Sequence, residues 1–264
     1  MDYKPAPPHK SAMIQVQDIV KTFQVGGNPV TVLNRVTFSI EAGEFVAIVG
    51  PSGNGKSTLL NMITGIDHPN QGKIIVAGKA IHQLSENQLA AWRADHVGIV
   101  FQFFQLLPSL SLLQNIILPM EFAGKIPARE RKERAHYLLE RVGLADQAAK
   151  LPGTVSGGQQ QRAAIARALA NDPPLIVADE PTGNLDAATA EDVFCLFLSL
   201  VREGKTLVMV THNQELAERL PRTLHILNGR VDYDITRIEQ RGGQYKDFDA
   251  LQRDFNCTSG PAGT

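Results

Sequence analysis

Residues 44–58 read EFVAIVGPSGNGKST, and this stretch decides the fold. The apolar run EFVAIVG (44–50) is typical of a buried strand, while KSTLLNMITG predicts a helix that stops at Gly65. The segment between them, GPSGNGKST, matches G-x-x-x-x-G-K-[ST], a loop whose backbone N–H groups converge on phosphates. It predicts a nucleoside triphosphate site built from Gly50, Pro51, Ser52, Gly53, Asn54, Gly55, Lys56, Ser57 and Thr58.

Two side chains of this loop carry specific chemistry. Lys56 is expected to reach the β- and γ-phosphates, and the Ser57 hydroxyl to ligate Mg²⁺. The alternative is a tight strand–helix turn without a ligand. The complete match between a strand and a helix disfavours that alternative. We call residues 50–58 the first cradle.

Further polar residues end two apolar strands. LIVADE (175–180) places Asp179 at a strand end, where a metal-holding carboxylate is expected, and Glu180 follows as a candidate general base for the attacking water. The simpler interpretation of Glu180 is an acidic residue at the start of a helix, in the turn that follows the strand. His212 ends TLVMVTH (206–212) and is a candidate γ-phosphate contact, although spacing alone leaves a purely structural role open.

Periodicity predicts an α/β fold. The apolar strands at 44–50, 175–179 and 206–212 alternate with helices, which indicates a mainly parallel sheet covered on both faces. MIQVQDIVKTF and VLNRVTFSI alternate like antiparallel strands, and Asn228-Gly229 predicts a terminal hairpin. Residues from about 85 to 160 are mostly helical by pattern, as expected for an inserted helical subdomain.

Composition limits the class of protein. The 264 residues are 43% hydrophobic, and 26 basic against 27 acidic side chains leave a net charge of −1, which gives no reason to expect nucleic acid as the partner. No stretch approaches the roughly 20 apolar residues of a membrane span. Cys195 and Cys257 form no disulfide framework by pattern, so a reducing, cytosolic compartment fits best. Residues 1–12 are expected to be a flexible leader, and residues 241–264 a disordered tail.

A second candidate anion site opens another helix. VSGGQQQR (155–162) contains the capping-box pattern S-x-x-Q at Ser156 and Gln159. Gly157 and Gly158 follow at the first two helical positions, where glycine weakens a helix by roughly 1 kcal/mol relative to alanine. Such glycines leave backbone N–H groups open to an anion, while a well-capped helix without a ligand is the simpler interpretation. Because this second cradle (155–159) has no lysine, it is expected to contact only a phosphate that another site already binds.

These motifs together resemble the ATP-binding cassette family from about Met13 to Asp234. GPSGNGKST resembles its Walker A motif, LIVADE its Walker B motif, and VSGGQ its signature motif, with Val155 in place of the usual leucine. VFQ resembles the Q-loop, which implies that Gln102 touches Mg²⁺ and the γ-phosphate. Asn184-Leu185-Asp186 resembles the D-loop, and His212 the switch histidine. Phe23 lies where the family stacks an aromatic ring on adenine.

The resemblance implies one nucleotide-binding domain over residues 13–240 that binds ATP and Mg²⁺. It implies a head-to-tail homodimer in which the second cradle of one copy closes on the ATP held by the first cradle of the other. Backbone groups at Asn54, where serine is commoner, are expected to do the binding work.

Within the family, ADEPTGNLD and FQFFQLLPSLSLLQNIILPM resemble the subgroup of lipoprotein release, macrolide or peptide export and cell division. The implied partners are an integral permease and, in some such systems, a periplasmic or extracellular adaptor. The implied location is the cytoplasmic face of the cell membrane, reached through the permease. Phe103, Phe104, Leu106 and Leu107 then lie in the groove for the permease's coupling helix, with simple core packing as the alternative.

Three other functions stay open at this point. The first is an ATPase that signals across the membrane, in cell division or envelope control, without transporting a substrate. The second is a cassette protein acting on ribosomes or DNA, which the single cassette and the absence of a basic surplus disfavour. The third is a small-molecule kinase, which has no use for VSGGQ.

Overall fold

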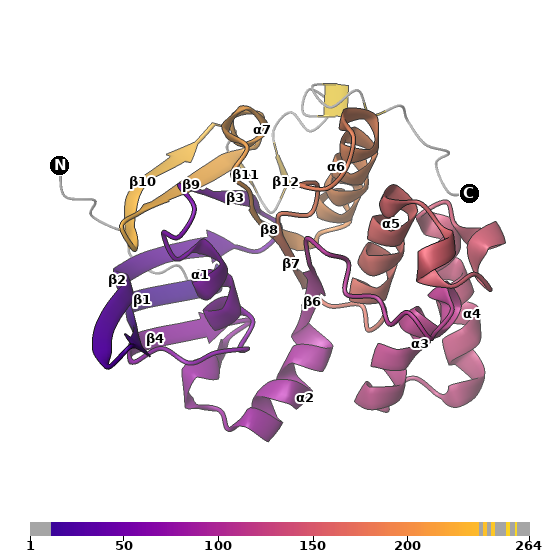
Figure 1. The fold of residues 1–264 in the computed structure, drawn as a ribbon, viewed down its shortest axis with the longest axis horizontal. Coiled ribbons are helices and arrows are strands. Elements are labelled where there is room, and N and C mark those ends of the chain that lie inside the picture. The colour runs from indigo at the N-terminus through magenta and orange to yellow at the C-terminus, as the bar shows by residue number, and fades with distance from the viewer. Residues whose placement is uncertain (1–11, 238–239, 242–243, 246–251, 254–256, 258–264) are drawn as a thin grey trace.

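The computed structural model describes residues 12–237, together with 240–241, 244–245, 252–253 and 257. Residues 1–11 of the expected leader and most of the expected tail lie outside the described residues. Two large sheets, a short two-stranded sheet and two groups of helices form the described part of the fold, with the parallel strands between the helix groups (Figure 1). The predicted α/β class, with an antiparallel β-subdomain and a mainly parallel core sheet, is confirmed.

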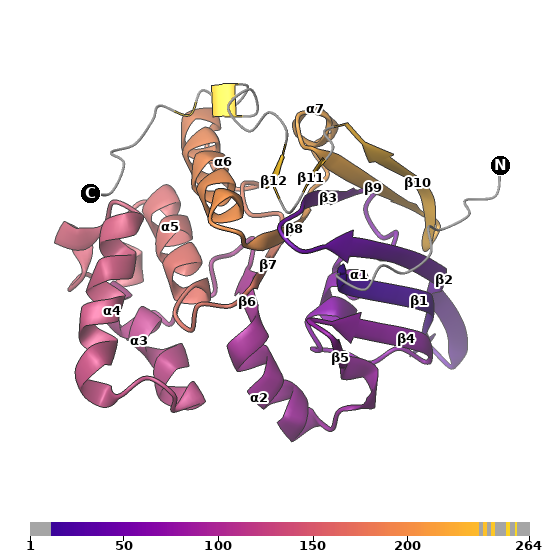
Figure 2. The same cartoon turned by 180° about the vertical axis from the view of Figure 1, so that it is seen from behind.

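The antiparallel sheet has the order β2-β1-β4-β5. Its strands are β1 (Ala12–Val25), β2 (Asn28–Glu41), β4 (Gln71–Val76) and β5 (Lys79–Ala80). The alternating residues of β1 bury Ile14 and Val16 on one face, because successive side chains of a strand point to opposite sides. This sheet lies beside the core sheet, next to helix α1 (Figure 2).

The core sheet has the order β10-β9-β3-β8-β7-β6. The strands β3 (Phe45–Val49), β6 (Val97–Val100), β7 (Leu175–Asp179), β8 (Thr206–Val210) and β9 (Arg222–Leu227) run parallel to their neighbours. The predicted hairpin joins β9 to the antiparallel edge strand β10 (Arg230–Thr236), with Asn228 and Gly229 both at positive φ, 49° and 69°. The short strands β11 (Gln240–Arg241) and β12 (Gln244–Tyr245) pair with each other.

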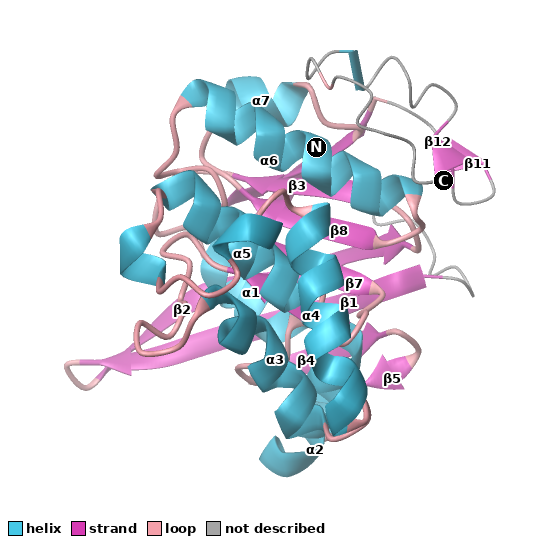
Figure 3. Ribbon diagram, turned by 90° about the vertical axis from the view of Figure 1, so that its right-hand side faces the viewer, coloured by secondary structure: helices cyan, strands magenta, loops and turns pink. Residues whose placement is uncertain are grey.

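Helices cover both faces of the core sheet. The cluster on one face joins Val46 and Ile48 of β3 to α1 (Lys56–Ile63), and the cluster on the other joins Phe45 and Ala47 to α5 (Gly157–Ala168) and α6 (Ala187–Arg202). Helices α3 (Leu112–Ala123) and α4 (Ala128–Arg141) extend the second cluster away from the core sheet (Figure 1), and in Figure 3 they lie in front of the strands. Helix α7 (Gln214–Glu218) precedes β9. Short 3₁₀ helices lie at 81–83, 145–147 and 152–154.

The range 85–160 is less uniformly helical than the pattern predicts. It contains β6, which pairs with β7 in the core sheet, and four residues are too few to distinguish a buried strand from a helix by periodicity. Helix α2 (Glu86–His96), just before it, packs Leu89 and Trp92 into the cluster of α1. Among the predicted helices of this range, α3, α4 and α5 therefore pack together. The buried side chains of α2 instead pack in the cluster of α1, on the other face of the core sheet.

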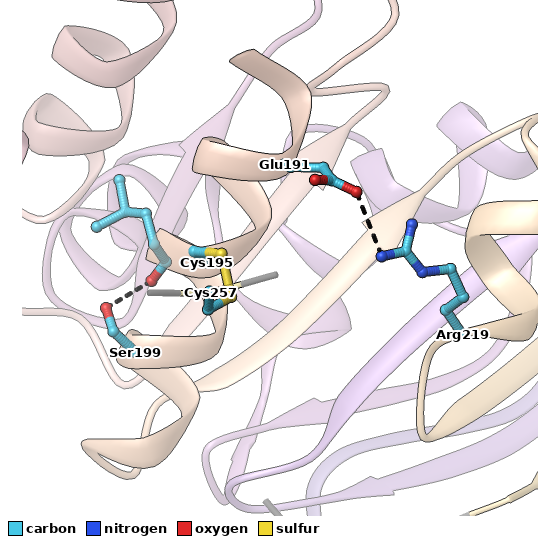
Figure 4. Close-up of a disulfide and its surroundings, with 6 residues drawn as sticks. Glu191, Cys195, Ser199, Arg219 and Cys257 are labelled. Carbon is cyan, nitrogen blue, oxygen red and sulfur yellow. Dashed lines mark hydrogen bonds and ion pairs between the residues drawn. A yellow bond between two sulfur atoms is a disulfide. The ribbon is translucent and has the colours of Figure 1, made fainter. Parts of the chain in front are cut away.

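The expectation that the two cysteines form no disulfide is wrong. Cys195 on α6 and Cys257 are bonded, with their Cα atoms 5.4 Å apart and a separation of 62 positions in sequence (Figure 4). One turn earlier on the same helix, Glu191 forms an ion pair with Arg219 at 3.5 Å. A single pair so distant along the chain has no sequence signal, because only the fold brings the two residues together. The argument from unpaired thiols to a reducing compartment therefore has no basis.

Candidate active site

The first cradle connects the end of β3 to the start of α1. Lys56 is buried, and its ammonium donates to the carbonyl oxygens of Gly50 at 2.8 Å and Pro51 at 2.9 Å. A Cβ atom at Gly50, where φ is 148°, would lie 2.1 Å from the Ile226 carbonyl oxygen, so only glycine fits this passage. Burial lowers the pKa of Lys56, and the charges of Glu180 and Asp179 oppose that shift. The lysine therefore lies inside the loop, beside two carboxylates.

Asn54 contributes more than the backbone role expected for it. Its amide donates to the carbonyl oxygens of Pro51 and Ser52, both at 3.2 Å, and its Oδ1 accepts the N–H of Asn228 at 2.6 Å. The turn of the β9–β10 hairpin is itself held to β2, since Asn34 N–H donates to the Gly229 carbonyl at 2.8 Å. The hairpin therefore supports the first cradle. No sequence signal connects residues 54 and 228.

The predicted metal ligands Ser57 and Asp179 are adjacent. Ser57 Oγ donates to Asp179 Oδ1 at 3.4 Å, which joins the first turn of α1 to the end of β7. Burial raises the pKa of Asp179, the hydrogen bond from Ser57 lowers it, and the nearby Glu180 raises it further. A hydroxyl and one carboxylate fit Mg²⁺, which keeps several waters and takes substrate phosphates as ligands. The described residues contain no group of three His, Cys, Asp or Glu side chains placed to hold a metal.

Glu180, His212 and Gln102 meet beyond the strand ends. His212 Nδ1 lies 3.0 Å from Glu180 Oε2. A Cβ atom at Gly183 would lie 3.1 Å from Gln102 Nε2 and 3.7 Å from Glu180 Oε2, so both side chains border that glycine. Glu180 has φ 46°, the left-handed region that is costly for a side chain with a Cβ atom. Its backbone N–H donates to the Val210 carbonyl at 2.9 Å, which fixes it at the sheet edge.

Phe23 lies on β1, half-exposed. Lys21 Nζ approaches its ring at 4.9 Å from the centroid while forming an ion pair with Asp67 at 2.6 Å. Phe23 is thus 38% exposed, with the Lys21 ammonium over its ring.

The second cradle has the predicted capping box. Ser156 Oγ accepts the N–H of Gln159 at 3.3 Å, and the Gln159 side chain accepts the N–H of Ser156 at 2.9 Å. Gly158 also has a packing role that the sequence does not reveal. A Cβ atom there would lie 2.3 Å from Cγ2 of Thr189, so this glycine lets α5 approach the start of α6.

Asp186 has a structural partner in this chain. Its carboxylate accepts from Thr189 Oγ1 at 2.6 Å and from Thr189 N–H at 3.0 Å, which caps α6. These two hydrogen bonds lower the pKa of Asp186. The preceding Asn184 donates from Nδ2 to the Gln102 carbonyl at 3.2 Å. The D-loop segment is thus joined to Gln102 on one side and to α6 on the other.

The two cradles open helices on opposite faces of the core sheet. Helix α1 belongs to one cluster and α5 to the other, and Figures 1 and 2 place them on different sides of β7 and β8. Among the described residues, no hydrogen bond or ion pair joins the side chains of Lys56 or Ser57 to the second cradle.

A groove of about 450 Å³ lies beside the Gln102 segment. It is lined by residues of α2, β6, α3, α5 and the segment between β6 and α3, including Arg93, Phe101, Gln105, Leu107, Phe122 and Arg167. Phe122 is 82% exposed and Phe103, next to the groove in sequence, is 68% exposed. Of the four apolar residues predicted for a groove here, Phe103 and Leu107 are exposed, while Phe104 and Leu106 are half-buried. No described helix combines the length and apolar character that crossing a membrane requires.

Comparison with known proteins identifies the family of this chain. Residues 33–183 match the family model described as ABC transporter. The chain is 48% identical over 207 residues to the lipoprotein-releasing system ATP-binding protein LolD of Aquifex aeolicus, covering 78% of this chain and 92% of that protein.

A second relative is the macrolide export ATP-binding/permease protein MacB of Sodalis glossinidius. It is 43% identical over 228 residues, covering 86% of this chain but 35% of that protein. A solved structure, the dimeric post-hydrolysis state of the ATP-binding cassette MJ0796 bound to ADP and Pi, superposes with a TM-score of 0.80 at 39% identity. That match covers 86% of this chain and 100% of the other.

Proposed function

Because the chain belongs to the ABC transporter family as an ATP-binding and ATP-hydrolysing subunit, we propose that two copies close head to tail on two ATP molecules and drive a membrane permease of the lipoprotein-release or macrolide-export type. The two similar proteins that carry these names support the subgroup, and the dimeric cassette bound to ADP and Pi supports the dimer.

The placement of the two cradles supports the composite site. They open helices on opposite faces of one sheet, and only the first carries a lysine and the metal ligands. A γ-phosphate held by Lys56 is therefore best reached by the Ser156 turn of another copy. Twofold symmetry then produces two equal sites from one sequence.

Each group at the first cradle has a role in hydrolysis. The Lys56 ammonium moves from the Gly50 and Pro51 carbonyls to the β- and γ-phosphates. Ser57, Asp179 and Gln102 would hold Mg²⁺, which would supply positive charge to offset the charge of the phosphates.

Glu180 accepts the proton of the attacking water, and His212, 3.0 Å from it, orients that carboxylate and the γ-phosphate. Phe23 supports the adenine ring by stacking, and Asp186 positions the dimer contact next to the α6 cap.

The groove beside the Gln102 segment is the proposed docking site for a helix of the permease. Its exposed Phe122 and Leu107 provide the apolar surface that such a helix requires, and Arg93 and Arg167 supply positive charge at its wall. Docking there would hold the chain at the cytoplasmic face of the cell membrane. A periplasmic or extracellular adaptor would complete the assembly on the other side, as a partner of the permease.

Mixing two inactive variants tests the composite site. Lys56→Ala disables the first cradle, and Ser156→Arg blocks the second. Each alone is expected to lose ATPase activity. Their equal mixture should recover roughly a quarter of the wild-type rate, since half of the dimers are mixed and each mixed dimer has one intact site.

The control is the double variant Lys56→Ala/Ser156→Arg mixed with Ser156→Arg, in which no dimer has a complete site and no activity should return. Ser156→Arg should still bind a fluorescent ATP analogue, which shows that it is folded. A Ser156→Arg chain that hydrolyses ATP at full rate alone, or a mixture with no recovery, would refute the proposal.

A further inference from the structure

The segment that follows Gln102 has an unusual backbone. Phe104 and Gln105 are both left-handed, with φ of 58° and 54°. Two consecutive non-glycine residues rarely adopt this conformation, because the Cβ atom crowds the following carbonyl group. Such a pair persists only where neighbouring groups hold it.

Arg167 is the group that holds them. From the last turn of α5 its guanidinium donates to the Phe104 carbonyl at 2.9 Å and to the Gln105 carbonyl. The side chain is half-buried, and burial lowers the pKa of Arg167. A planar guanidinium with fixed N–H directions can engage both carbonyls at once, which suits it to fixing a backbone pair.

The other end of Phe104 reaches the second cradle. A Cβ atom at Gly157 would lie 3.7 Å from Cζ of Phe104, so the ring is in contact range of the first residue of α5. Gly157 and Arg167 are ten residues apart, about 15 Å along a helix. Phe104 therefore meets both ends of α5: its carbonyl group accepts from Arg167 in the last turn, and its ring approaches Gly157 in the first turn.

The same residues face the groove. Phe101, Gln105 and Arg167 all line it, so any partner seated there contacts the segment that Arg167 holds. On the other side of this segment, Gln102 is joined to Asn184 and borders Glu180. The guanidinium thus holds a segment that borders the groove, follows Gln102 and approaches the second cradle through the Phe104 ring.

We propose that Arg167 is a positioning residue that keeps the second cradle in the conformation that receives the partner copy's ATP. Without the guanidinium, residues 104–105 relax from the left-handed region and the Phe104 ring leaves Gly157. The Ser156 turn then loses the contact that fixes its N–H groups. This inference rests on the proposed ATP-sandwich dimer.

The test measures the two cradles separately in the Glu180→Gln variant. This variant is expected to dimerise in ATP and Mg²⁺ without hydrolysing ATP. Arg167→Ala should weaken ATP-dependent dimerisation roughly ten- to hundredfold by sedimentation velocity, the range for losing a charged hydrogen-bond donor. Binding of a fluorescent ATP analogue to the dilute monomer, which uses only the first cradle, should stay unchanged. If Arg167 served only in folding, Arg167→Ala would reduce both the dimerisation and the binding of the ATP analogue.

Arg134→Ala is the matched control. Arg134 also donates to two backbone carbonyls of the same region, Ala170 at 2.6 Å and Leu169 at 3.3 Å, but it does not touch residues 104–105. Dimerisation of this variant should match the parent. Adding Gln105→Gly to Arg167→Ala should restore part of the affinity, because glycine adopts φ 54° without a Cβ penalty.

Three results would overturn the inference: undiminished dimerisation of Arg167→Ala, equal weakening in Arg134→Ala, or no recovery with Gln105→Gly. If Glu180→Gln itself stays monomeric, the proposed function fails instead. The two failures are therefore distinguishable.

Discussion

Replacing Gly158 with alanine should destabilise the protein, although alanine is the better helix former. Gly158 is the second residue of α5, where alanine gains up to about 1 kcal/mol. The new Cβ atom would lie 2.3 Å from Cγ2 of Thr189, and Thr189 cannot easily turn away because Oγ1 donates to Asp186. Overpacking of this kind costs about 1–3 kcal/mol. The free energy of unfolding should fall by about 1–2 kcal/mol.

The effect of Gly158→Ala on the free energy of unfolding should change sign when Thr189 is replaced by serine. Thr189→Ser removes Cγ2 and keeps the hydroxyl that caps α6, and the nearest remaining atoms, Cβ and Oγ, lie 3.5 Å from the alanine Cβ position. That is ordinary van der Waals contact. In this background Gly158→Ala should be neutral or stabilising, by up to about 1 kcal/mol. The double-mutant cycle then yields a coupling energy well above the roughly 0.5 kcal/mol of independent sites.

Urea and thermal unfolding of the nucleotide-free protein measure both effects. A loss of 1–2 kcal/mol corresponds to a decrease in Tm of roughly 2–8 °C. Gly157→Ala is the control at the neighbouring position, since its Cβ atom would meet only the Phe104 ring at 3.7 Å, and no loss is expected. The same destabilisation by Gly158→Ala with threonine or serine at position 189 would refute the packing argument.

Three further predictions concern single groups. Asp179→Asn should abolish Mg²⁺-dependent hydrolysis yet raise the free energy of unfolding at pH 7. Because burial raises the pKa of Asp179, its contribution to stability is lost as pH rises through that pKa, and the gain from asparagine should vanish in urea titrations below about pH 4. Cys257→Ser should lower stability by at most about 4 kcal/mol, the loop-closure value for 62 residues, and reductant should then have no further effect on Tm. Asp186→Ala should lower the Tm by removing the α6 cap, whereas Asp186→Asn should keep the parent Tm, so an activity loss in the asparagine variant reports on the dimer contact alone.

Local patterns determined much of this protein. The glycine-rich loop between a strand and a helix, the apolar strands that end at Asp179 and at Val210, and the Asn228-Gly229 hairpin all depend on neighbours in sequence. Backbone preferences and side-chain periodicity therefore encode them, although β8 ends two residues before the predicted strand end at His212. The capping box at Ser156 is likewise a four-residue signal.

Tertiary structure alone decided the features that join distant segments. The β6 strand is too short to carry a period, and it is a strand because it pairs with β7. Cys195 meets Cys257, Asn54 meets Asn228, and Arg167 meets Phe104 only because the fold closes loops of about 60 to 170 residues between them. Gly158 is the clearest case, since its sequence context suggests an anion site, whereas the nearby methyl group of Thr189 reveals a packing requirement as well. Close packing depends on which surfaces meet, and no local pattern specifies that.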